Sequence, residues 1–117
     1  MLHSFVLLDG NLGDKQVGTF SYDTEAKRFG MTITKELSRE DLPLSLECFV
    51  HRGKYTLTHE DALRWVSGRI CPPGRHNISE ILRDNGLSEY DEYGLLMVNM
   101  ARCDKDDLYL YKTTVSL

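Results

Sequence analysis

The chain has 117 residues, a length that suits one compact domain with its own hydrophobic core. Its composition, 41% apolar and 27% charged residues, is that of an ordinary soluble globular protein. The chain has a net charge of −4 and no excess of basic residues of the kind that nucleic-acid-binding domains carry, so direct contact with nucleic acid is not expected.

The cysteines and the N-terminal residues indicate a reducing compartment. Cys48, Cys71 and Cys103 are odd in number and widely spaced, which favours free thiols over a disulfide framework. Residues 1–11 are apolar over too short a stretch to span a bilayer, and they lack the basic start of a signal peptide. We therefore expect a cytoplasmic protein without a membrane segment.

Strands are predicted in the first half of the chain. Residues 3–9 form an apolar run that ends at an Asp-Gly-Asn turn signal. Residues 15–22 and 28–35 alternate in the manner of half-buried strands, and their short connections favour an antiparallel meander. Residues 44–51 are interpreted as a fourth short strand, which places the strand-rich part of the chain at about residues 3–57.

Three short helices are predicted over about residues 58–100, each with a capping residue and an acidic residue three positions later. These pairs are Thr58 and Asp61, Asn77 and Glu80, and Ser88 and Asp91. Pro72-Pro73 stops the first helix, and Gly86 suits the left-handed end of the second. Residues 108–111 alternate weakly and are a candidate last strand.

Strands followed by helices predict an α+β domain. We expect a small antiparallel β-meander followed by three short helices packed on one face, with residues 1–117 as a single domain.

A run of carboxylates, Asp104, Asp106 and Asp107, follows Arg102 near the end of the chain. Clustered aspartates can hold calcium, but this run lacks the alternating ligands, the glycine and the final glutamate of an EF-hand loop. A solvated turn, in which Arg102 pairs with one of the carboxylates, is therefore favoured over a cation site.

No metal, cofactor or catalytic residue is assigned. The histidines His3, His51, His59 and His76 are scattered and lack zinc-like spacing, so surface or capping roles are expected. Residues 9–14 contain two glycines but lead into a strand, whereas a phosphate-binding loop leads into a helix. This segment is therefore predicted to be a hairpin turn.

Trp65, the one tryptophan, is either a core residue of its helix or a partly exposed anchor for a partner. Arg64, Arg69 and Arg75 either pair locally or form a small basic rim near it. If this corner is a contact surface, the partner-binding residues are Trp65, Arg69, Arg75 and Arg102.

Several short motifs occur in a characteristic order over about residues 14–108. They are Gly18-Thr19-Phe20-Ser21-Tyr22-Asp23, Leu42-Pro43-Leu44-Ser45-Leu46, Trp65, Ile70-Cys71-Pro72, Arg75, Gly86-Leu87, Leu95-Leu96 and Ala101-Arg102-Cys103-Asp104. This order resembles the N-terminal subdomain of HipA-type kinase toxins, a small β-rich module followed by short helices.

The chain departs from that family at four points. Cys103 splits the Arg-Asp element, Asp106-Asp107 replace a small Gly-Ala pair, the proline at 72 is doubled, and the spacing to Arg75 is shortened. The chain also stops where the family's kinase body would begin, so a kinase catalytic Asp-Asn set has no room. A stand-alone copy of the subdomain is therefore expected.

The resemblance implies a partner. A free subdomain of this type, the HipS type, binds a HipA-like serine/threonine kinase and regulates it as part of a bacterial toxin–antitoxin system. A helix-turn-helix DNA-binding protein can accompany the pair. Alone, such a module is expected to be a monomer or a weak homodimer, with no cofactor.

Two other functions stay open on the sequence. One is a small enzyme of unknown type that uses Asp104, Asp106 or a histidine. The other is a homo-oligomeric structural protein that pairs through the edge of its C-terminal strand.

Overall fold

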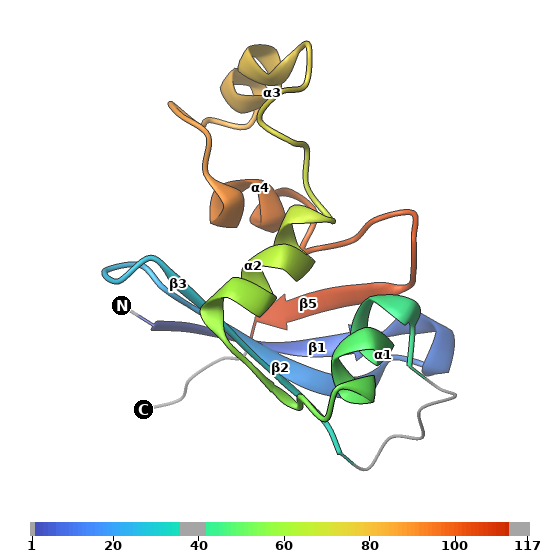
Figure 1. Cartoon of the computed structure of the whole chain (residues 1–117). Coiled ribbons are helices and arrows are strands. Elements are labelled where there is room, and N and C mark those ends of the chain that lie inside the picture. The colour runs from blue at the N-terminus through green and yellow to red at the C-terminus, as the bar shows by residue number, and fades with distance from the viewer. Residues whose placement is uncertain (1, 36–41, 113–117) are drawn as a thin grey trace.

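A computed structural model describes residues 2–35 and 42–112, and of the predicted strand-rich part only residues 36–41 lie outside it. The described residues form one antiparallel sheet with the strand order β4-β3-β2-β1-β5 (Figure 1). Its strands are β1 (Leu2–Asp9), β2 (Lys15–Asp23), β3 (Arg28–Ile33), β4 (Thr56–Leu57) and β5 (Leu108–Lys112). The three N-terminal strands and the last strand are confirmed.

The alternation of the strands sets which face is buried. Phe29, Met31 and Ile33 of β3 lie in the core, as their spacing predicts. Between β1 and β2 the register shifts after Leu7, which pairs with Gly18. A Cβ at Gly18 would lie 2.4 Å from the carbonyl oxygen of Thr32, so only glycine fits at this close approach of two strands.

Residues 44–51 are a helix, α1 (Leu44–His51), so the predicted fourth strand is wrong there. Leu46, Phe49 and Val50 are buried, and their spacing of three and four residues is that of one helix face. A short apolar run has this ambiguity, because strand and buried helix look alike over eight residues. The strand after it, β4, has two residues.

Three further helices follow, as predicted: α2 (His59–Ser67), α3 (Ile78–Asp84) and α4 (Glu92–Val98). The Thr58 hydroxyl accepts a hydrogen bond from the backbone N–H of Asp61 at 3.2 Å, which confirms the first cap. Asn77 makes no capping bond with its side chain, and Asp91 rather than Ser88 caps α4. Gly86 has a φ of 73°, the predicted left-handed conformation.

Helices α1, α2 and α4 form a second layer on one face of the sheet, which confirms the α+β class (Figure 1). Trp65 of α2 lies against Phe20, with ring centroids 6.0 Å apart. Tyr93 of α4 stacks on Tyr22 with centroids 4.2 Å apart. These aromatic pairs fix α2 and α4 over the sheet.

Helix α3 is the exception to the packing that the sequence predicts. Figure 1 shows it standing away from the sheet, and within the described part of the chain it contributes no buried residue. The segment from Cys71 to Tyr90, which we call the arm, is closed at its base where the Tyr90 hydroxyl donates to the Cys71 carbonyl at 2.7 Å. No helix of the described residues is both long and apolar enough to cross a membrane.

The caps give the first prediction. Replacing Thr58 by Ala removes the partner of one free amide of α2, and we expect it to lower the free energy of unfolding by about 1 kcal/mol. The matched change Asn77→Ala removes no capping bond, so its effect should be clearly smaller. Urea unfolding of both variants measures the difference, and equal losses would contradict this assignment of the caps.

Candidate functional site

Arg69, two residues after the end of α2, is the centre of a buried network. Its Nε donates to the Ala101 carbonyl at 2.6 Å, and Nη2 donates to the Leu108 carbonyl at 3.2 Å. Nη1 and Nη2 donate to the two carboxylate oxygens of Asp106 at 2.9 and 2.6 Å, a bidentate ion pair. The side chains of Arg69 and Asp106 are only 3% and 7% exposed, so the pair is structural.

Asp106 extends this network to a third segment. It accepts a hydrogen bond from the Ser45 hydroxyl of α1 at 2.9 Å and another from the backbone N–H of Leu108 at 3.0 Å. Burial acts to raise the pKa of Asp106, but the bonds and charge of Arg69, with those from Leu108 and Ser45, hold it below its ordinary value. We call Arg69, Asp106 and Ser45 the clasp.

Trp65 is buried, with 4% of its surface exposed, as the core interpretation predicts. The Arg69 guanidinium lies 4.6 Å from the centre of its ring, a cation–π contact that the clasp holds in place. The indole Nε1 has no hydrogen-bond partner among the described residues. Trp65 is therefore packed beside Arg69 and does not project from the surface.

A pocket of about 330 Å³ opens beside this corner, between α1, α2 and the turn at residue 105. Phe49 and Trp65 line it with apolar surface. The described charged residues that line it are all cationic, namely Arg52, Arg64, Arg69 and Lys105. The charge around this cationic pocket is therefore opposite in sign to the net charge of the whole chain, which is −4.

The predicted basic rim exists, but with other members. Arg64 is on it, with 73% of its side chain exposed, and it also pairs locally, because its Nη1 lies 3.9 Å from a carboxylate oxygen of the buried Asp61. Arg69 is not an exposed contact residue, because its guanidinium is buried against Asp106. Arg52 and Lys105 take its place at the surface, and Lys105 Nζ donates to the Gly68 carbonyl at 3.0 Å.

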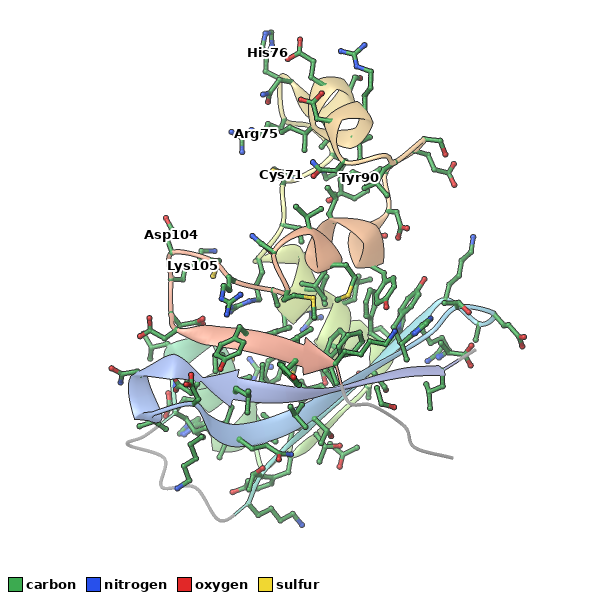
Figure 2. All side chains as sticks on the ribbon, turned by 180° about the vertical axis from the view of Figure 1, so that it is seen from behind. Cys71, Arg75, His76, Tyr90, Asp104 and Lys105 are labelled. Carbon is green, nitrogen blue, oxygen red and sulfur yellow. The ribbon has the colours of Figure 1, made fainter. Side chains whose placement is uncertain are left out.

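Arg75 and Arg102 lie apart from the pocket. Arg75 is exposed on the arm, where its Nε donates to the Asn77 side chain at 3.1 Å, and Figure 2 shows it near His76 and far from Lys105. Arg102 lies over the Tyr109 ring at 4.5 Å, and it is Arg69 that pairs with Asp106. The four predicted contact residues are therefore spread over three places.

The aspartates of residues 104–107 differ in their surroundings. Both Asp106 oxygens are bound by Arg69, and Asp104 is exposed. Among the described residues no group of three or more His, Cys, Asp or Glu side chains is arranged to hold a metal ion. His59 accepts a hydrogen bond from the backbone N–H of Phe29 at 3.0 Å, which ties α2 to the sheet.

The sequence analysis does not identify the pocket residues from α1 and the position after it, which are Cys48, Phe49 and Arg52. They were missed because residues 44–51 were interpreted as a strand. The spacing of three and four residues between Leu46, Phe49 and Val50 is the sequence signal that indicates a helix. The three cysteines are free thiols, as expected, and Cys48 is exposed.

Comparison of the chain with protein-family models, curated proteins and solved structures finds no match in any of the three. The resemblance to the HipA N-terminal subdomain therefore stays a prediction that depends on the motifs quoted for it.

The clasp gives the second prediction. Asp106→Asn leaves the buried Arg69 charge uncompensated, so we expect unfolding at neutral pH to become easier by about 3 kcal/mol. The exposed neighbour Asp104 is the matched control, and Asp104→Asn should change stability by less than about 0.5 kcal/mol.

The same pair sets a pH dependence. Because the folded-state pKa of Asp106 is lowered, its contribution is fully present above the ordinary pKa of 3.8 and is lost as pH falls through the folded value. The stability gap between the native chain and Asp106→Asn should therefore narrow below about pH 4. Chemical denaturation from pH 7 to pH 3 measures it, and a gap that stays constant would refute the assignment.

Proposed function

We propose that this chain is a non-catalytic binding module that binds and regulates a HipA-like serine/threonine kinase in the bacterial cytoplasm. The observation that carries the proposal is the clasp. It joins the end of α2 to residues 101–108, so two separate pieces of the motif order belong to one corner of the domain. A module that acts by contact needs such a rigid corner and no reacting group of its own.

The fold supports the same proposal. The small antiparallel sheet with short helices after it agrees with what the resemblance implies. Gly18 lies where two strands approach closely, Gly86 ends α3 in a left-handed conformation, and Leu96 of α4 is fully buried. Each of these motif residues has a structural reason in this chain.

The contact surface we propose has two parts. One is the cationic pocket, with Arg64 on its rim and Trp65 in its wall. The other is the arm, which carries Arg75 away from the body of the domain (Figure 2). A partner that engages both parts would be held in one orientation, and binding to the kinase N-lobe would favour one of its open and closed states.

The third prediction tests this. The chain should co-purify with a HipA-like kinase encoded beside it and lower the autophosphorylation rate of that kinase at micromolar concentration. Arg64→Glu should weaken the complex about tenfold or more, because it reverses a charge on the rim. Arg28→Glu, on the β2–β3 hairpin at the far end of the sheet from α1, is the matched control and should bind normally (Figure 1).

Two results would end the proposal. In the first, the adjacent kinase does not bind the chain, and its autophosphorylation rate is the same with and without the chain. The other is a stable homo-oligomer of the chain in which the pocket and the arm are covered, which would favour the structural-protein alternative. Size-exclusion chromatography with light scattering measures the second.

A further inference from the structure

We infer that the cationic pocket binds an acidic peptide segment that inserts one apolar side chain. The inference deepens the proposed function by naming what enters the pocket. It rests on the proposed function in one respect, which is that the acidic segment belongs to the kinase. Its three supports are the lining of the pocket, the charges on its rim and the rigidity of its wall.

The lining suits an apolar anchor. Phe49 of α1 and Trp65 of α2 supply aromatic surface, and most of the exposed surface of the pocket is apolar. Its volume of about 330 Å³ is at the lower end of the range for ligand sites. A space of this size takes one large apolar side chain with the main chain on either side of it.

The rim suits carboxylates on both sides of that anchor. Arg52 follows the end of α1, Arg64 lies on the outer face of α2, and Lys105 lies on the turn before β5, so the cations approach the pocket from three directions. All three residues are exposed. A segment with acidic residues flanking its anchor would therefore meet opposite charge at both ends.

The charge of Arg69 is already used inside the protein. Its guanidinium is bound by Asp106 and by two backbone carbonyls, so it holds the Trp65 ring in place without facing a ligand as a free cation. The wall of the pocket is therefore formed before binding, so less conformational entropy is lost when a ligand binds.

A nucleic acid is the other anionic polymer that a basic rim can attract. Three surface cations around an apolar pocket, on a chain of net charge −4, are a poor match for a phosphate backbone, which binds through long basic stripes. The structure therefore favours the peptide, and an oligonucleotide serves as a comparison probe.

The chain carries its own reporters for the fourth prediction. Trp65 is the one tryptophan in the sequence, so its fluorescence reports on the pocket alone. Cys48 also lines the pocket and is exposed, whereas Cys103 is half-buried and does not line it. Alkylation of Cys48 compared with Cys103 is therefore a second, independent measure of occupancy.

The experiment titrates the full chain with capped pentapeptides of the form Glu-Asp-X-Asp-Glu, where X is Leu, Ile or Phe. We expect a saturable change in Trp65 emission and slower alkylation of Cys48 with no change at Cys103. Peptides with Lys in place of the acidic residues, or with Ser in place of the apolar anchor, should bind about tenfold more weakly or worse.

Variants assign the binding to the rim. The double change Arg52→Glu and Arg64→Glu should weaken peptide binding about tenfold or more, while Arg28→Glu should leave it within about twofold. All three substituted positions are exposed, and thermal unfolding checks that each variant folds.

The outcomes separate the two proposals. Peptide binding that depends on the rim, without any kinase complex, supports this inference and removes the proposed function. A kinase complex that forms normally with the double variant, with no acidic peptide bound, overturns this inference and leaves the proposed function standing. Rim-dependent binding of a single-stranded oligonucleotide, with all peptides inactive, overturns it in favour of nucleic acid.

Discussion

The buried pair of Arg69 and Asp106 is the interaction on which the arrangement of the second half of the chain depends. It lies where α2 ends, where the chain returns after α4, and where β5 begins, and Ser45 adds α1 to the same point. Lysine would not replace Arg69, because one ammonium cannot bind both carboxylate oxygens and two carbonyls in this planar geometry. A buried ion pair of this kind gains little stability over apolar packing, but losing one partner is costly.

The position of the pocket follows from that pair. The guanidinium that binds Asp106 also lies over the Trp65 ring, so one side chain fixes both the turn before β5 and the wall of the pocket. Phe49 lies on α1 and Arg52 directly follows it, and the Ser45 hydrogen bond connects this helix to Asp106. Three segments that are distant in the sequence thus build one surface. A substitution at Asp106 would therefore change the structure of the pocket, although Asp106 does not line it.

Local signals in the sequence were sufficient for much of the fold. Alternation identified β1 to β3, and the Thr58 hydroxyl identified the start of α2, because both depend on neighbours within a few residues. The start of α4 was misplaced because Ser88 and Asp91 are both good caps, and the structure uses the second. Helix α1 was missed because eight apolar-rich residues fit either period.

The site was less predictable, because its residues meet only in three dimensions. Arg69 and Asp106 are 37 positions apart and are both of a type that usually lies at the surface, so nothing local marked them as a buried pair. Arg102 was the nearer and more obvious partner, yet it lies over Tyr109 instead. Trp65 was identified as either core or anchor, and the structure shows that it is buried and lines a pocket.

The charges of the surface argue for a partner that binds in one orientation. The cationic pocket lies between α1 and α2, whereas the charged residues that line a second pocket near the N-terminus of α4 are three carboxylates and one lysine, namely Glu89, Asp91, Glu92 and Lys27. Burial raises the pKa of Tyr22 in that second pocket, and the charges of Asp91 and Glu92 raise it further. A surface with separated signs repels an acidic segment from the second pocket while it attracts one to the first. The cations around the first pocket and the excess of carboxylates around the second therefore favour the first pocket as the binding site for an acidic segment.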